Sequence, residues 1–219
     1  MTETDSQMVH VDRDWLALRE TGHLLVERGF AGGRRRAALG RARRRTAPVP
    51  LYRAAFVPTL ALSLAGPLLG LARGAKELVL ASLATDRGIS HTHYAQAREA
   101  PSTQMQLAEA ASLIDTATLH LMRAADDVDS CAASGQCMPL VNRTRARMDI
   151  GTLARCSRDA LDLLPSIQGA RSFADDSPLQ RIWRDLETGT RHAMVNPAIA
   201  TEMNGRTLLG IEDQITPLI

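Results

Sequence analysis

Residues 102–130 read STQMQLAEAASLIDTATLHLMRAADDVDS, and this stretch decides the fold. Its apolar and small residues recur at alternating steps of four and three: Leu107, Ala111, Ile114, Thr118, Leu121, Ala125 and Val128. Such spacing keeps every member on one face of an α-helix and is typical of helices that pack side by side. The stretch therefore predicts a long helix within a helical bundle.

Further helices are predicted on both sides of this stretch. They cover about 56–86, 139–164 (stopping at Pro165) and 178–196, followed by a short helix from Pro197 to Gly205 or Gly210. The predicted core face of the 139–164 helix is Ile150, Leu153, Ala154, Ser157, Ala160, Leu161 and Leu164. Ser177, Pro178 and Gln180 form a capping-box start for the 178–196 helix. No segment alternates with a period of two, so we expect an all-α chain with an antiparallel four-helix bundle over residues 48–219.

Composition agrees with a helical protein that needs no disulfides. Apolar residues make up 45% of the 219 residues, and only 3% are aromatic. The three cysteines are odd in number and show no CxxC spacing, which indicates reduced thiols in a cytoplasmic protein. The first eight residues lack the charged start and apolar run of a signal peptide.

The basic residues gather near the N-terminus. Residues 1–50 carry a net charge of +4, whereas residues 51–219 carry −2. Residues 28–45 hold eight arginines spaced by Gly and Ala, so that segment cannot form a packed core and is expected to be irregular. Nucleic acid or anionic lipid is a possible partner for such charge, but no recognisable binding motif adjoins it. We therefore interpret residues 28–45 as a solvated tail and expect no nucleic-acid partner.

Residues 54–72 are uncharged and flanked by Arg53 and Arg73, so their length passes the usual threshold for a membrane span. Pro58, Pro67 and the many small residues count against insertion, and the predicted helix continues into charged residues. The central helix of a bundle gives the same signal. We expect a bundle helix and no membrane partner.

A metal site has little support in the sequence. Glu20 and His23 have the Glu-x-x-His spacing of carboxylate-bridged metals but lie outside the bundle, and His91 and His93 lack a third ligand nearby. His192 shares a predicted polar helix face with Arg181, Asp185 and Thr188, and on spacing alone it is a surface or hydrogen-bonded histidine.

Two passages carry a family resemblance. The first is Tyr94-Ala-Gln-Ala-Arg98, followed by Gln104 and then Leu107-Ala-Glu109. The second is Gln168-Gly169-Ala170, followed by residues 178–185, PLQRIWRD. Both resemble passages of the acyl-CoA dehydrogenase C-terminal domain, and they occur in the same order. Where a dehydrogenase has a catalytic Glu, residues 188–192 read TGTRH, so the chain is most similar to two-component flavin-dependent monooxygenases.

The resemblance implies roles for five residues. His192 is placed as the catalytic residue, a general base or hydrogen-bond partner beside flavin and substrate. Arg98 is implied as a ligand of flavin phosphate, often that of a neighbouring subunit. Gln104, Gln168 and Gly169 are implied as further cofactor-binding residues.

The resemblance also implies an activity and its partners. The chain is expected to act as a hydroxylase component that uses reduced flavin (FMN or FAD) and O₂ on an aromatic or similar small-molecule substrate. A flavin reductase and a homotetramer are the implied partners. Two alternatives stay open: an acyl-CoA dehydrogenase-like oxidoreductase, and a non-catalytic helical oligomerisation bundle that needs a partner chain.

Residues 1–47 are interpreted as the remnant of a β-domain end plus the Arg-rich segment. Residues 15–22, WLALRETG, resemble the closing strands of the family's middle β-domain, but the Arg-rich run replaces the expected continuation. That domain covers the flavin ring and excludes water. A reading-frame slip within 28–45 is one hypothesis for the replacement, and the isolated chain is expected to hold about half of an active site.

Overall fold

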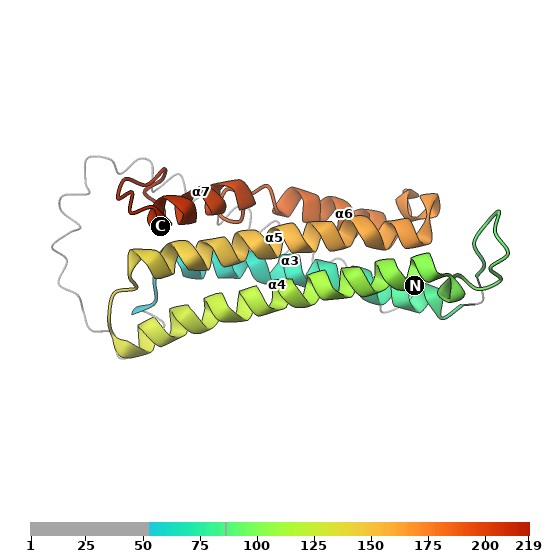
Figure 1. Ribbon diagram of the computed structural model, residues 1–219, viewed down its shortest axis with the longest axis horizontal. Coiled ribbons are helices and arrows are strands. Elements are labelled where there is room, and N and C mark those ends of the chain that lie inside the picture. Colours follow the sequence, from blue (N-terminus) through green and yellow to red (C-terminus); the bar gives the residue numbers. More distant parts are fainter. Residues whose placement is uncertain (1–52, 86) are drawn as a thin grey trace, which may run out of the picture. The chain divides into compact units, whose positions relative to one another are not determined.

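The computed structural model describes residues 53–85 and 87–219, all of them helical or irregular (Figure 1). The helices are α3 (Phe56–Leu83), α4 (Pro101–Ser134), α5 (Leu140–Gln168), α6 (Pro178–Gly189) and α7 (Pro197–Leu208), with 3₁₀ turns η2 (Ala97–Glu99) and η3 (Ala170–Phe173). This confirms the predicted all-α class within the described part. The β-domain remnant, the Arg-rich segment and the boundary at residue 47 lie outside it.

Helices α3, α4 and α5 lie side by side and alternate in direction (Figure 1). Two short helices share the fourth side of this group of helices. Helix α6 packs on α3 and α5, and α7 packs on α5. Helix α5 contacts each of the other four helices. It therefore holds the described part together and links its two ends.

The predicted core face of α5 is confirmed at all seven positions, every one of which is buried. Ile150, Leu153 and Leu164 have no exposed surface, and Leu161 is 1% exposed. Each such side chain contributes about 1.5–3 kcal/mol of burial free energy. This face is therefore a main source of stability.

The predicted face of α4 is only partly right. Ile114 and Val128 are buried as expected, but the alanines that pack tightly on this side of the helix are Ala110, Ala117 and Ala124. Each of these lies one position before a predicted residue, whereas Ile114 and Val128 belong to both sets, so the buried face is turned only part of the way toward the preceding residues. The physical reason is that α4 packs against both α3 and α5, and alanines at the contact let helix backbones approach closely.

Helix α3 is the one helix in the described part with the length and composition to cross a membrane. One of its faces enters the core through Ala61, Ala65, Leu68, Ala72 and Val79. A core helix of a globular protein passes the same test of length and apolarity. The packing thus gives α3 a role inside the helical core.

Two predicted helix ends differ from the structure. Helix α5 continues past Pro165 to Gln168, so the proline lies inside its last turns. Helix α6 ends at Gly189, well before Asn196. The hydroxyl of Thr190 bonds the Leu186 carbonyl at 2.9 Å, and such side-chain bonds compete with helix continuation. Ser177 stands at the N-cap of α6, but its side chain makes no capping hydrogen bond, so the predicted capping box does not form.

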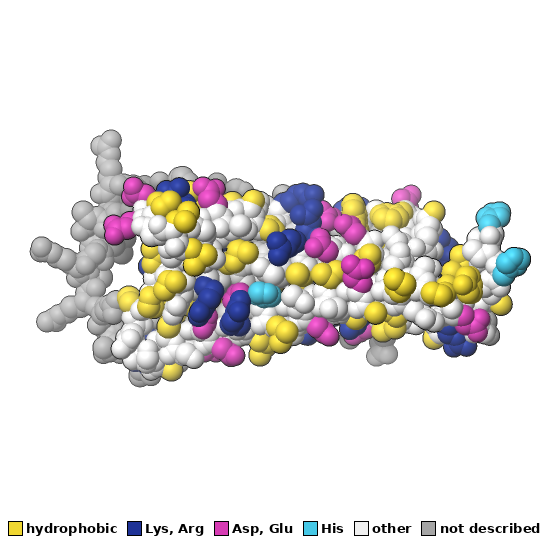
Figure 2. Space-filling model, viewed as in Figure 1, with side chains coloured by type: hydrophobic (Ala, Val, Ile, Leu, Met, Phe, Trp, Pro, Cys, Tyr) yellow, Lys and Arg dark blue, Asp and Glu magenta, His cyan; other side chains and the backbone are white. Residues whose placement is uncertain are grey.

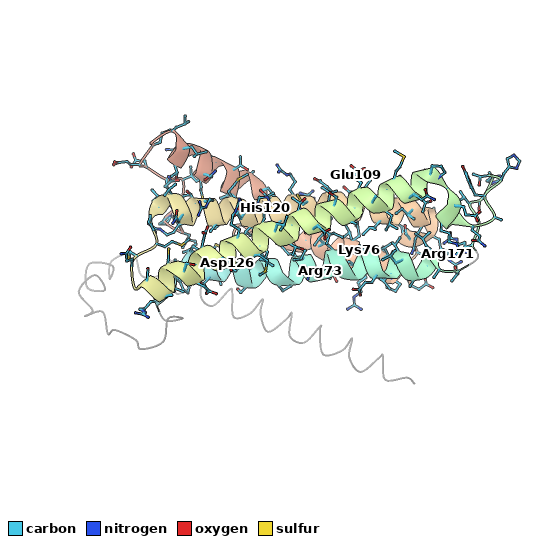
Figure 3. The ribbon with its side chains drawn as sticks, turned by 60° about the horizontal axis from the view of Figure 1, so that its bottom comes forward. Arg73, Lys76, Glu109, His120, Asp126 and Arg171 are labelled. Carbon is cyan, nitrogen blue, oxygen red and sulfur yellow. The ribbon has the colours of Figure 1, made fainter. Side chains whose placement is uncertain are left out.

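A buried carboxylate ties α4 to α5 halfway along their contact. Asp149 on α5 is 1% exposed and accepts hydrogen bonds from Arg123 Nε at 2.9 Å and from His120 Nδ1 at 2.7 Å. Figure 3 shows His120 on the middle of α4, far from Arg171 at the end of the helices. The hydrogen bond that Arg123 donates to Asp149 is the largest factor that raises the pKa of Arg123. This ion pair fixes the register of α4 on α5.

Candidate functional site

One candidate site is a large cavity at the C-terminal end of α5, called here the Gln168 cavity. Its volume is about 570 Å³, and residues 82–83, 87–90, 97, 102–103, 106 and 166–171 line it. These residues come from the end of α3, the loop between α3 and α4, the start of α4 and the end of α5. Figure 2 shows histidine side chains at the tip of the same α3–α4 loop. The cavity is large enough for part of a cofactor.

The Gln168 cavity is suited to an anion. Arg87 and Arg171 line it, and none of its described lining residues is acidic. Ser102 and Thr103 belong to the first turn of α4, whose N-cap makes no side-chain hydrogen bond. Amides at a helix start carry a partial positive charge and bind phosphate readily. Two guanidinium groups and a helix N-terminus therefore face one space.

The backbone at Gly169 gives the cavity one of its walls. Its φ of 72° and ψ of −166° belong to a region that essentially only glycine adopts. Its amide donates to the Pro165 carbonyl at 3.0 Å, and its carbonyl accepts from the Ser172 hydroxyl at 2.7 Å. Phe173 then packs edge-on against Trp183 of α6, with ring centroids 5.7 Å apart. These contacts hold the turn after α5 in a fixed shape.

The predicted cofactor residues are distributed unequally around this cavity. Gln168 and Gly169 line it, whereas Arg98 and Gln104 do not, although each directly follows a lining residue in the sequence. Arg98 Nε donates to Gln96 Oε1 at 2.7 Å, and Gln104 Nε2 donates to the Arg98 carbonyl at 3.1 Å. Their roles in cofactor binding stay predictions.

Sequence reasoning missed both arginines of the cavity wall. Arg87 Nη2 donates to the Gln168 carbonyl at 3.1 Å, across 81 positions in the sequence. Arg171 follows the Gly169 turn directly, and that closeness to a recognised motif was the available signal. No local pattern around Arg87 indicates its long-range contact.

The second candidate site is the turn of residues 190–195 between α6 and α7, called here the His192 turn. His192 is exposed and lies in this turn, not on the helix face predicted for it. Thr190 is 1% exposed at the base of the turn, and Val195 N donates to the His192 carbonyl at 2.9 Å. Pro197 forces an extended conformation on Asn196, which then caps α7 by accepting from Ala198 N at 2.9 Å.

The imidazole of His192 is held in a defined state. The amide of Met194 donates to its Nδ1 at 3.2 Å, so a neutral ring carries its proton on Nε2. Partial desolvation lowers the pKa of His192, and the positive charge of Arg147 lowers it further. At neutral pH this side chain is therefore an uncharged hydrogen-bond donor.

The carboxylate of Glu187, just before the His192 turn, is bound by two arginines. Glu187 accepts from Arg158 Nε of α5 at 2.9 Å and pairs with Arg191. Burial alone would raise the pKa of Glu187, but the hydrogen bonds and charges of the two arginines outweigh it and lower the pKa. Glu187 thus fastens α6 to α5 and stays ionised. Arg181 and Asp185, which were predicted to share a polar face of this helix, form an ion pair at 4.0 Å.

The two candidate sites lie far apart. Arg147 of α5 donates to the Ala193 carbonyl at 3.2 Å, which places the His192 turn beside residue 147. Gln168 is 21 positions further along the same helix. At about 1.5 Å per residue, the separation is about 30 Å. The Gln168 cavity and the His192 turn are therefore two separate sites.

Among residues 53–85 and 87–219, no group of three or more His, Cys, Asp or Glu side chains could hold a metal ion. The His91 and His93 pair has no third ligand within that range.

The sequence matches the family model described as acyl-CoA dehydrogenase, C-terminal domain, over residues 62–197. It is 30% identical over 176 residues to the oxygenase subunit HsaA of a flavin-dependent monooxygenase from Rhodococcus jostii, which covers 77% of this chain and 43% of that protein. HsaA from Mycobacterium tuberculosis is 28% identical over 174 residues, covering 76% and 42%. The chain thus spans less than half the length of these curated relatives.

Two solved structures are also similar to this chain. XiaF from Streptomyces sp., in complex with FADH2 and glycerol, is similar with a TM-score of 0.75 and 34% identity, over 79% of this chain and 43% of XiaF. The 3-HSA hydroxylase from Rhodococcus sp. RHA1 is similar with a TM-score of 0.70 and 27% identity, over 80% and 44%.

Proposed function

This chain belongs to the acyl-CoA dehydrogenase C-terminal domain family, and from that premise we propose that it is the helical part of a flavin-dependent monooxygenase, the hydroxylase component. The observation that carries the proposal is His192, an exposed imidazole with a lowered pKa, at the position where the family resemblance implies the catalytic Glu of the dehydrogenases. The names of the relatives support the same activity.

The proposed cofactor is reduced flavin, FMN or FAD, which supplies electrons to O₂ when it is bound. The Gln168 cavity fits the phosphate end of such a cofactor through Arg87, Arg171 and the amides at the start of α4. Arg98 and Gln104, each of which directly follows a lining residue in the sequence, would reach the part of the cofactor that extends outward. The separation of about 30 Å supports a homotetramer, in which each chain offers its Gln168 cavity to one flavin and its His192 turn to another.

For His192 the geometry favours one of the two roles implied by the family resemblance. A neutral ring that accepts from Met194 N at Nδ1 donates from Nε2, which stabilises negative charge on a substrate oxygen. Action as a general base at Nε2 requires the proton to move to Nδ1 and breaks the bond from Met194. We therefore assign His192 as a hydrogen-bond donor to a phenolic or similar oxygen.

The remaining parts of the proposal concern partners. Reduced flavin would come from a separate flavin reductase, and the substrate would be an aromatic or similar small molecule. A cytoplasmic location fits a reductase partner. Polypeptide that covers the flavin ring and excludes water is also required, since the match to this chain covers only 42–43% of the length of the relatives.

Exposed apolar side chains favour the non-catalytic alternative as a second candidate. Met105 and Leu119 on α4 are each 71% exposed, and Met122 is 54% exposed. Such residues are typical of a surface that pairs with another polypeptide.

Acyl-CoA oxidation coupled to flavin reduction would instead identify the dehydrogenase-like alternative.

The test is an anaerobic titration of the full chain with reduced FMN and reduced FAD, with and without a separately expressed N-terminal half of a relative. Binding in the presence of that half supports a flavoenzyme. Absence of binding under both conditions excludes catalysis by this chain and leaves the oligomerisation bundle.

Substitutions at His192 then test its role in the reconstituted complex. As a hydrogen-bond donor, His192→Ala lowers hydroxylation about 10²–10³-fold, and His192→Gln, which keeps an N–H donor, recovers part of the loss. Equal loss in both variants would instead identify a general base, and no loss in His192→Ala would remove His192 from the site.

A further inference from the structure

Arg147 on α5 is an unusual charge for the interior of a helical bundle. It is 2% exposed, the largest side chain among the fully buried residues. Its guanidinium donates to the Ala193 carbonyl at 3.2 Å, the Leu218 carbonyl at 3.4 Å and the Met194 sulfur at 3.5 Å. All three acceptors are uncharged, and Nε has no hydrogen-bond partner.

Within residues 53–85 and 87–219, no acidic side chain pairs with the positive charge of Arg147. Arginine stays protonated in proteins, and burying its charge costs several kcal/mol unless a partner compensates. Burial lowers the pKa of Arg147, which is the effect of an environment that does not stabilise the cation. By comparison, Arg123, Arg145 and Arg158 each pair with a carboxylate.

A cavity of about 140 Å³ lies against Arg147, between α5, the His192 turn and the C-terminal tail. Its other walls are mostly apolar and come from Ala193, Met194, Ile199, Ile215, Thr216 and Leu218. For comparison of size, an enclosed apolar cavity of about 150 Å³ binds benzene. The space beside Arg147 is partly open to solvent, is about the size of one six-membered aromatic ring, and has one arginine in its wall.

We propose that this cavity, called here the Arg147 cavity, binds a small aromatic anion of the benzoate class. The carboxylate lies on the guanidinium, for which a planar two-oxygen anion is the best geometric match. The ring lies against the aliphatic side chains of Ile199, Ile215 and Leu218. The anion supplies the charge that the protein groups around Arg147 lack.

The C-terminal tail forms the cover of this site. Leu218 accepts from Arg147 through its carbonyl, and Arg143, one turn earlier on α5, donates to a main-chain oxygen of Ile219 at 3.1 Å. Ile215 and Leu218 are each more than 40% exposed, so the tail is a thin layer over the cavity. A ligand can enter by displacement of the tail without opening the helical core.

The occupied cavity would also affect His192. Ala193 and Met194 line the cavity and directly follow His192 in the same turn. A bound anion opposes the charge of Arg147, which would raise the pKa of His192 toward its ordinary value. The site is separate from the Gln168 cavity and does not require flavin.

The test is calorimetric titration of the full chain with benzoate, with its neutral isostere benzamide and with acetate. We expect benzoate to bind about tenfold or more tightly than either, because benzamide lacks the charge and acetate lacks the ring. Equal affinity for benzoate and benzamide, or no binding of benzoate, would overturn the proposal.

Three variants locate the binding. Arg147→Met removes the guanidinium and should abolish the preference for benzoate, whereas Arg145→Met, two positions away and exposed, should leave it unchanged. Thr216→Trp fills the cavity from the tail, keeps Arg147 and leaves the helical core intact, so it separates loss of the site from loss of folding. Unchanged benzoate affinity in Thr216→Trp would show that the anion binds elsewhere.

Discussion

The two ends of α5 differ in nearly every property that matters for binding. The Gln168 cavity is large, built from loops and a helix start, and lined by two arginines that reach it from the surface. The Arg147 cavity is about a quarter of that volume, mostly apolar, and holds one buried guanidinium. One end suits an extended phosphate-bearing molecule, and the other suits a single ring.

The largest expected effect comes from the core between the two ends. Leu161→Ala removes a side chain that is 1% exposed and leaves a cavity, so we expect a loss of about 2–5 kcal/mol in the free energy of unfolding. Leu119→Ala, on a residue 71% exposed, should change it by less than about 0.5 kcal/mol. Urea denaturation of both variants measures the difference, and equal losses would contradict the packing of α5.

A substitution at Gly169 should affect the Gln168 cavity alone. Gly169→Ala places a Cβ on a backbone conformation that costs other residues about 1–3 kcal/mol. We expect lower stability and weaker flavin binding, with the NMR signals of the His192 ring unchanged. Gly205→Ala is the matched control, because it lies within α7 and its Cβ would meet nothing within 4 Å. A shift of the His192 signals in Gly169→Ala would show that the two ends are coupled.

At the other end, Glu187→Gln should loosen α6 from α5. The carboxylate is 14% exposed and holds two arginines, so we expect a loss of about 1–2 kcal/mol near pH 7. Its pKa in the folded chain lies below the ordinary value of 4.5. The contribution is therefore complete above that value and disappears as the pH falls through the folded pKa. Thermal unfolding from pH 7 to pH 3 should show the wild type and the variant converging at the acid end. Glu202→Gln, an exposed residue, should show no such convergence.

The smallest effect is a shift in the titration of His192. Arg147 lowers the pKa of His192, so Arg147→Met should raise it, whereas Arg147→Lys keeps the charge and should leave it low. The other cation beside this ring, Arg191, is paired with Glu187 in both variants. NMR titration of the ring signals gives the direction. A higher pKa in Arg147→Lys as well would assign the effect to packing rather than charge.

The sequence predicted most of the fold, because helix periodicity is a local property that marks the apolar face of each helix. All seven predicted core positions of α5 are buried, since its apolar stripe is flanked by charged residues. The α4 prediction was right at Ile114 and Val128 but one residue late at three other positions, because alanines occupy both candidate faces and only contact with α3 and α5 decides between them. The end of α6 was wrong because the Thr190 hydroxyl and the Asn196–Pro197 cap act across several residues.

The sites were less predictable than the fold. Gln168 and Gly169 were found through a motif, but Arg87 reaches the same cavity only after the chain has folded back over 81 positions. Arg147 gave no signal, since an arginine in a helix is ordinarily a surface residue. A charged residue whose role depends on its burial cannot be recognised from the sequence until the packing of the helices is known.

The length of α5 has a consequence for how proteins with this fold can change. Because the Arg147 and Gln168 ends lie on one continuous helix, an inserted residue turns one end by about 100° relative to the other. Seven inserted residues, close to two full turns, would nearly restore the facing while moving the ends apart by about 10 Å. Divergence within α5 should therefore proceed by substitution. Insertions and deletions should gather in the α3–α4 loop and the C-terminal tail, because a change of length there alters neither the spacing nor the relative rotation of the two ends of α5.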